Sequence, residues 1–180
     1  RTFKEALQKG FRSLEIGMPG LGKDFYPLGT DPEVIRSKLR VPNSKRLLYL
    51  RQAIWEGFTD AEIFELTQID PWFLTHIRHL VAFEGCLVEA AAQGPKWSPQ
   101  GPLGELFREA KELGFSDQQL AIIFQRPEKE VRDLRTAMAI LPTYKLVDTC
   151  AAEFEAYTPY FYSSYEQENE ARSTEARKVV

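Results

Sequence analysis

Two segments in the middle of the chain share the same order of helix-stop and helix-start residues. Gly57 is followed by Pro71 after 14 residues, and Gly114 is followed by Pro127 after 13 residues. Glycine commonly ends a helix, and proline is favoured in the first turn of the next one. The shared order predicts an internal repeat in which a helix, a short helix and a proline-started helix follow one another.

Each short helix of this repeat begins with a capping box. Thr59 with Glu62, and Ser116 with Gln119, follow the Ser/Thr-x-x-Glu/Gln pattern. In such a box the hydroxyl and the later side chain satisfy two backbone N–H groups at the helix start. The segment 94–102, "GPKWSPQGP", separates the repeats with three prolines. No alternation of strand and helix is present, so the fold class predicted is all-α, an irregular helical bundle with two helix-turn-helix-like repeats.

The N-terminal part of the chain predicts two further helices. The first runs from Thr2, as the N-cap, to Gly17, because apolar residues recur there at steps of four, four and three. The second starts at Asp31 and Pro32, an acidic cap followed by a first-turn proline. The residues that set the spacing of the first helix are Phe3, Leu7, Phe11 and Leu14.

The C-terminal part has a different character. Pro142 ends the last helix, "TYKLV" is predicted to be extended, and five of the seven tyrosines fall between Tyr144 and Tyr165. Tyrosines on an irregular segment are typical of a segment that lies against another surface. We therefore predict a helical connecting domain over residues 1–145. Residues 146–180 are predicted to form an extended, tyrosine-rich strap and linker, which is called the strap below.

The composition excludes several classes of partner. The chain has 23 Lys and Arg against 26 Asp and Glu, a net charge of −3, which does not attract nucleic acid or an anionic membrane. No apolar stretch reaches the length of a membrane span. Two cysteines cannot form a disulfide framework, which favours a reducing cytoplasm. The sequence predicts a cytoplasmic protein.

The segment "FSDQQLAIIFQRPEKEVRDLR" has the outline of a helix-turn-helix, so a nucleic-acid-binding module is the alternative function. From residue 102 to 141 there are seven acidic and six basic residues. A recognition helix carrying Glu128, Glu130 and Asp133 would repel phosphates. Charge therefore argues against this alternative.

Two other patterns suggest chemistry but lack necessary parts. "GMPGLGKD", residues 17–24, departs from the phosphate-binding loop at its last position, where Asp24 replaces the hydroxyl residue, and a flexible surface loop is predicted instead. His76 and His79 could share a helix face with Cys86, but the cysteine is about 10 Å further along the axis. We predict no cofactor site and no metal site, and solvent-facing or hydrogen-bonded histidines.

Cys150 is the sharpest candidate for catalysis, with Asp148 and Glu153 beside it. A catalytic thiol needs a base, and both histidines lie some 70 residues earlier. Neighbouring carboxylates would raise the thiol pKa and disfavour the thiolate. We predict no catalytic residue. Cys150 is expected to be a small buried thiol, and Asp148, Cys150 and Glu153 are expected to be structural anchors.

Several stretches together resemble a known family. They are "SLEIG", "LTQIDPWFL", "GFSDQQLA" and "YKLVDTCAAEF" followed by "YFYSSYE". From Thr2 to about Glu168 the chain resembles the oligomerisation domain of the large subunit of carbamoyl phosphate synthase, the glutamine-hydrolysing type. The terminal "RKVV" resembles the first strand of the family's second synthetase half, so the chain is expected to be cut from a longer one.

The resemblance implies a non-catalytic oligomerisation and connecting domain. Its parent would be an ATP-dependent ligase that makes carbamoyl phosphate for arginine and pyrimidine biosynthesis. It implies a position between two ATP-grasp halves, which phosphorylate bicarbonate and carbamate and hold ATP, Mg²⁺ and K⁺. It also implies a glutaminase small subunit as partner, and self-association. The residues expected at interfaces are Trp72, Phe73, Tyr160, Tyr162 and Tyr165.

Overall fold

The computed structural model describes residues 2–22, 28–151, 153–154 and 160–171 of the 180-residue chain. The terminal "RKVV" and part of the 17–24 loop lie outside the described residues. Within them, the helices are α1 (Phe3–Ser13), α2 (Pro32–Arg40), α3 (Arg46–Trp55), α4 (Asp60–Thr67), α5 (Pro71–Ala92), α6 (Leu103–Glu112), α7 (Asp117–Phe124) and α8 (Glu128–Ala137). Two short strands follow, β1 (Thr143–Leu146) and β2 (Phe161–Ser164).

The main body is helical, which confirms the predicted class for that part of the molecule. The all-α prediction is incomplete, because β1 and β2 pair as an antiparallel hairpin in which Thr143 faces Ser164 and Leu146 faces Phe161. The sequence predicted an extended segment at "TYKLV", which contains β1, but it predicted no second strand at the position of β2.

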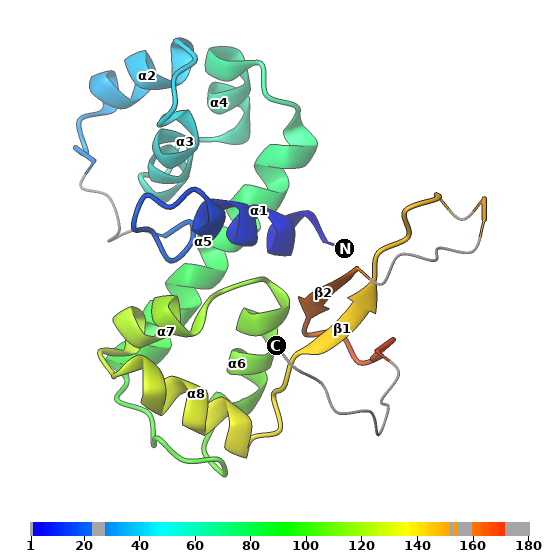
Figure 1. Cartoon of the computed structure of the whole chain (residues 1–180). Helices are drawn as coiled ribbons and strands as arrows, with labels where there is room; N and C mark the ends of the chain where they lie inside the picture. The colour runs from blue at the N-terminus through cyan, green and yellow to red at the C-terminus, as the bar shows by residue number, and fades with distance from the viewer. Residues whose placement is uncertain (1, 23–27, 152, 155–159, 172–180) are drawn as a thin grey trace.

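The long helix α5 joins two groups of helices. In Figure 1, α2, α3 and α4 lie at one end of α5, and α6, α7 and α8 lie at its other end. Residues of α5 accordingly divide between two hydrophobic clusters: Leu74, Ile77 and Val81 belong to the first, and Leu80, Phe83 and Leu87 to the second. The body therefore has two cores with one shared helix.

The starts and stops of the short helices α4 and α7 have the same geometry. Both capping boxes are formed. The preceding glycines, Gly57 and Gly114, have φ of 90° and 91°, and the C-cap residues, Gln68 and Gln125, are both left-handed. The helices that follow differ in length, since α5 has 22 residues and α8 has 10.

Helix α1 ends earlier than the sequence predicts. Thr2 caps it by accepting the N–H of Glu5, as expected, but the last helical residue is Ser13 and Glu15 has a left-handed φ of 54°. Leu14 is exposed, so the spacing that extended the prediction to Gly17 does not mark a buried face there. The face that α1 buries is partly polar and consists of Glu5, Gln8 and Phe11.

A buried hydrogen-bond network holds α1 to the loop after it and to α7. The Gln8 side chain accepts the backbone N–H of Leu21 at 2.8 Å, and the Gln119 amide donates to Gln8 at 3.3 Å. The Ser116 hydroxyl donates to the carbonyl of Pro19 at 2.9 Å. Residues 18–22 are buried, so the flexible surface loop predicted at 17–24 is wrong for this part, because Met18 and Leu21 join the first core.

Candidate functional site

An ionic cluster at the end of the helical body connects three helices. The Lys111 ammonium of α6 lies 2.8 Å from the Asp117 carboxylate at the start of α7, and Arg135 of α8 donates to the same carboxylate at 2.9 and 3.0 Å. Lys111 also donates to the Phe115 carbonyl. We call Lys111, Asp117 and Arg135 the Asp117 cluster. Burial alone would raise the pKa of Asp117, but the charges and hydrogen bonds of Lys111 and Arg135 hold it below its ordinary value.

The strap binds to the body through this cluster. The Tyr165 ring lies over Lys111 and over Arg135, with ring centroid distances of 5.0 and 5.8 Å. Burial raises the pKa of the Tyr165 phenol. Such cation–π contacts are stronger when partly desolvated. Tyr165, which the sequence suggested for an interface, therefore makes these ring contacts within its own chain.

The hairpin is held by a second set of charges. The Lys145 side chain is almost fully buried and its ammonium lies 3.4, 3.3 and 3.5 Å from the carboxylates of Glu166, Glu168 and Glu170. Burial opposes the charge, but the hydrogen bond to Glu168 and the neighbouring carboxylates raise the pKa of Lys145 overall. The carbonyl of Ser163 also accepts a hydrogen bond from Lys9 of α1. The carboxylate contacts therefore stabilise the strap itself, because all three glutamates follow β2, and the hydrogen bond from Lys9 attaches the hairpin to α1.

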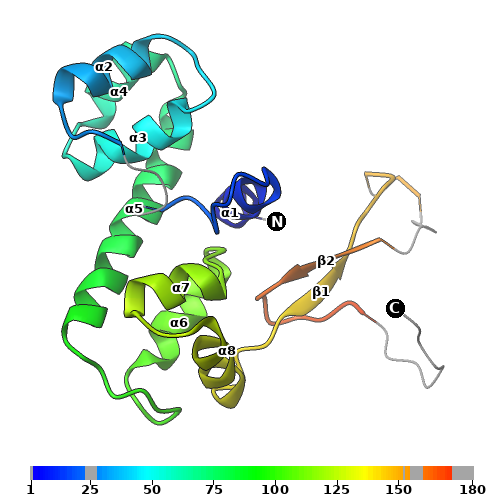
Figure 2. The same ribbon diagram turned by 60° about the vertical axis from the view of Figure 1, so that its left-hand side comes forward.

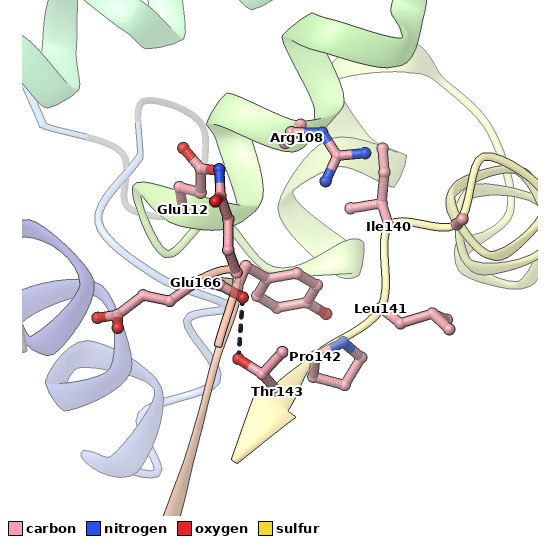
Figure 3. A pocket seen from close by; sticks show the side chains of 10 residues that line it. Arg108, Glu112, Ile140, Leu141, Pro142, Thr143 and Glu166 are labelled. Carbon is pink, nitrogen blue, oxygen red and sulfur yellow. Dashed lines mark hydrogen bonds between the residues drawn. The ribbon is translucent and has the colours of Figure 1, made fainter. Parts of the chain in front are cut away.

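A cavity of about 360 Å³ lies between α6, the α8–β1 connection and the strap. Figure 3 shows Arg108 extending toward Ile140, while Glu112 lies apart from it. The Thr143 hydroxyl donates to the carbonyl of Glu166 at 3.1 Å and closes one side. The lining offers charges of both signs, from Arg108, Glu112 and Glu166, and its described residues include no histidine, lysine or cysteine.

An aromatic cluster occupies the start of α5. Trp72 and Phe73 are 53% and 41% exposed, and both contact Phe3 of α1, with ring centroids 5.3 and 5.2 Å apart. His76 packs against Trp72 at 4.2 Å. We call Phe3, Trp72, Phe73 and His76 the aromatic cluster. Trp72 is not buried within its own domain, so an interface role for it stays a prediction.

The other candidate residues lie apart from one another. His79 contacts Lys4 through its Nδ1 atom, and burial together with the Lys4 charge lowers the pKa of His79. Cys86 is exposed. Among the residues that the structure describes, no group of three or more His, Cys, Asp or Glu is arranged to hold a metal ion.

Cys150 is half-buried and not the buried thiol that we predicted, because it lies in a turn of the strap outside both cores. The Asp148 carboxylate accepts the backbone N–H of Cys150 at 3.0 Å. The backbone N–H of Glu153 donates to the Cys150 carbonyl at 3.0 Å. Both contacts are of a kind that shapes a turn.

The basic residues of α8 are already paired. Arg132 contacts Glu128 at 2.6 Å and Lys129 contacts Asp133 at 2.5 Å, each four residues apart. Arg126, just before the helix, lies 3.6 Å from Glu130. A recognition helix is positioned on nucleic acid by contacts to phosphates, and these pairs leave little positive charge for such contacts.

No helix in the described ranges combines the length and apolar character that a membrane crossing needs.

Sequence reasoning missed the Asp117 cluster. Asp117 and Lys111 entered only the count of charged residues between positions 102 and 141. A signal was available, since Asp117 follows a capping serine directly and lies next to apolar positions of the second core. Arg135 is 18 residues away from Asp117, so only the packing of α7 on α8 brings the two together.

The described residues form a helical domain with two cores on a shared helix, an exposed aromatic cluster and a strap in contact with the Asp117 cluster. The family described as "carbamoyl-phosphate synthetase large chain, oligomerisation domain" matches residues 1–139. The chain belongs to this family and is the oligomerisation domain of a carbamoyl phosphate synthase large chain.

Curated relatives extend the similarity across the whole chain. The carbamoyl phosphate synthase large chain of Archaeoglobus fulgidus is 51% identical over 180 residues, which are 100% of this chain and 16% of that protein. The "large chain, N-terminal section" of Methanopyrus kandleri is 46% identical over 95% of this chain and 31% of its own length. The arginine-specific large chain of Arabidopsis thaliana is 41% identical over 100% of this chain and 15% of its own. The chain thus spans a small part of these relatives.

Proposed function

We propose that this chain connects and helps to assemble a large chain that makes carbamoyl phosphate from bicarbonate, glutamine-derived ammonia and two ATP. The observation that carries the proposal is the family match over residues 1–139, within which the exposed aromatic cluster lies. The product would serve arginine and pyrimidine biosynthesis in the cytoplasm. The name of the Arabidopsis relative supports the arginine branch.

We further propose that the domain lies between two ATP-grasp halves of the same large chain. Residues 1–145 would be the helical connecting domain, and the strap, residues 146–180, would lead into the second half. The boundary falls inside β1, between Lys145 and the last residue of the strand, Leu146. The matching caps of α4 and α7, and the equal φ of Gly57 and Gly114, support our proposal that the two helical groups are repeats.

The chemistry and the partners would belong to the rest of the parent protein. ATP, Mg²⁺ and K⁺ would bind in the ATP-grasp halves of the parent. A glutaminase small subunit would supply ammonia to the parent. For this domain the proposal assigns only binding surfaces.

The proposed interface residues divide into two groups. Trp72 and Phe73 are exposed on the helical body, and Tyr160 is exposed just before β2. Tyr162 and Tyr165 are half-buried, and Tyr165 contacts the Asp117 cluster. We therefore propose Trp72 and Phe73 as the primary self-association residues. Aromatic residues at partly exposed positions are typical anchors of interfaces.

Sedimentation of the full-length large chain tests this function. We expect Trp72→Ala and Phe73→Ala each to weaken self-association by about tenfold or more, as removal of an interface anchor does. Ile122→Ala is the matched control, because Ile122 is as exposed as Phe73 at 41% and its helix, α7, lies at the other end of α5 in Figure 1. Equal effects of all three changes, or a wild-type chain that is monomeric at every concentration, would argue against the proposal.

A further inference from the structure

The hairpin is polar on its inner face and apolar on its outer face. Successive residues of a strand point to opposite faces, and paired residues of neighbouring strands share a face. Lys145, paired with Tyr162, is only 2% exposed, whereas Tyr144 and Phe161 are 46% and 45% exposed. The outer face consists of Tyr144, Leu146, Phe161 and Ser163. This arrangement is the reverse of the usual sheet, which buries its apolar face on the core.

Contacts within the chain fix the hairpin in this orientation. The hydrogen bond from Lys9 of α1 to the Ser163 carbonyl holds the hairpin to the body. The carboxylates of Glu166, Glu168 and Glu170, which follow β2 in the strap, surround Lys145 on the inner face. One edge of β1 is also covered, because the Glu170 N–H donates to the Tyr144 carbonyl at 2.9 Å and the Leu146 N–H donates to the Glu170 side chain at 2.8 Å. The hairpin is therefore fixed from within.

The outer face is presented away from the helices. Figures 1 and 2 both show β1 and β2 standing to one side of the body, with no helix beyond them. Its four residues carry no charge, so an occupant would be held by apolar contact rather than by ion pairs. Tyr144 and Phe161 are exposed and Leu146, paired with Phe161, is half-buried. An exposed apolar patch is a mark of a contact surface.

The comparisons indicate which molecule supplies the occupant. The family match for the oligomerisation domain ends at residue 139, before β1 begins at Thr143. The similarity to large chains nevertheless continues through the hairpin, over 100% of this chain, in relatives of which the chain covers only 16%. The hairpin is thus part of the region shared with large chains but lies outside the segment matched as an oligomerisation domain. This position favours a partner surface within the same large chain over a second copy of the chain.

We infer that the outer face of the hairpin docks on an apolar surface of the same large chain, formed by residues outside these 180. The inference rests on the proposed function, because it assumes the longer parent. It assigns the two contact surfaces different duties. The aromatic cluster of α5 serves contact between chains, and the hairpin serves contact within one chain.

Photocrosslinking in the full-length large chain tests this inference. Phe161 is replaced by p-benzoylphenylalanine, and in a matched chain Tyr162, the next residue on the opposite face, is replaced instead. The chain is irradiated and the crosslinked peptides are identified by mass spectrometry. We expect the probe at Phe161 to join peptides of the same chain outside residues 1–180, at the mass of a single chain. We expect the probe at Tyr162 to join only peptides within residues 1–180.

The other outcomes overturn the inference. The inference is wrong if the probe at Phe161 joins two large chains, reaches a different subunit, reacts only within residues 1–180 or forms no crosslink. It is also wrong if the probes at Phe161 and Tyr162 join peptides outside residues 1–180 equally. Sedimentation of the same preparations keeps the two proposals apart. A monomeric chain with the expected crosslink contradicts only self-association, while an oligomer whose Phe161 crosslinks join two chains contradicts only the docking within one chain.

Discussion

The ammonium of Lys111 lies 2.8 Å from the carboxylate of Asp117, although the two side chains are only 6% and 8% exposed. Arg135 shares the same carboxylate, and the Tyr165 ring covers both cations. One acidic residue therefore holds α6, α7 and α8 together and supports the attachment of the strap. Buried charges of this kind are tolerated only when they are paired and hydrogen-bonded.

Replacement of this acid should destabilise the chain strongly. Asp117→Asn leaves the buried Lys111 and the partly buried Arg135 without their counter-charge, and breaking a buried pair typically costs about 3–5 kcal/mol. Urea unfolding measures the change. Asp133→Asn is the control, because its pair with Lys129 is exposed and such pairs contribute about 0.3–0.5 kcal/mol. Similar losses in the two variants would contradict the role assigned to Asp117.

The effect of Asp117 should depend on pH. Its pKa is lower in the folded chain than in the unfolded chain, so its stabilising contribution is present above the ordinary carboxyl pKa of about 3.9. The contribution is lost as the pH falls through the lower folded value. We expect the difference in unfolding free energy between wild type and Asp117→Asn to shrink below about pH 4. A difference that stays constant from pH 7 to pH 3 would show that the charge of Asp117 is not its cause.

Two glycines with the same backbone conformation should respond differently to alanine. Gly57 and Gly114 have φ of 90° and 91°, so alanine at either position incurs strain of about 1–2 kcal/mol. A Cβ at Gly57 meets nothing within 4 Å, but at Gly114 it would lie 2.9 Å from the Cα of Glu5 in α1. We expect Gly114→Ala to cost about 1–3 kcal/mol more than Gly57→Ala, the usual range for overpacking. Equal midpoints in thermal unfolding would mean that α1 moves away from the new Cβ with no loss of stability.

Cys150 should be dispensable for the activity of the parent chain. The part of the chain that the structure describes places no histidine beside its thiol, and the contact of its sulfur is with the Thr149 hydroxyl at 3.8 Å. We expect Cys150→Ser to keep carbamoyl phosphate synthesis within about twofold of wild type, since no step needs a thiolate here. A loss of several orders of magnitude with the fold intact would reopen a catalytic role.

The helical body was predictable where local interactions decide the structure. The capping boxes at Thr59 and Ser116 and the acidic cap at Asp31 form as the sequence predicts, because the groups that satisfy each helix start lie within three residues. The end of α1 was not predictable in this way. Leu14 continues the apolar spacing, yet no core lies opposite it, and the left-handed Glu15 ends the helix.

Some candidate site residues could likewise be identified from the local sequence, and others could not. The exposed Trp72 and Phe73 could be selected as interface candidates because an aromatic pair follows a helix-starting proline. The roles of Tyr144 and Tyr162, which lie on opposite faces of the hairpin, could not be separated from the sequence. Their roles depend on which face of the hairpin carries the buried Lys145, and therefore on pairing between residues about 20 positions apart.

The sequence by itself determined the helical class, the positions of most helix starts and, through its resemblance to a known family, the kind of domain. These features depend on local capping, on periodicity and on characteristic short segments. Only the tertiary structure decided that Asp117 is a buried hub, that Tyr165 turns inward and that the hairpin presents Tyr144 and Phe161 outward. The physical reason is that burial and pairing of charges arise from contacts between distant segments, which local sequence patterns do not specify.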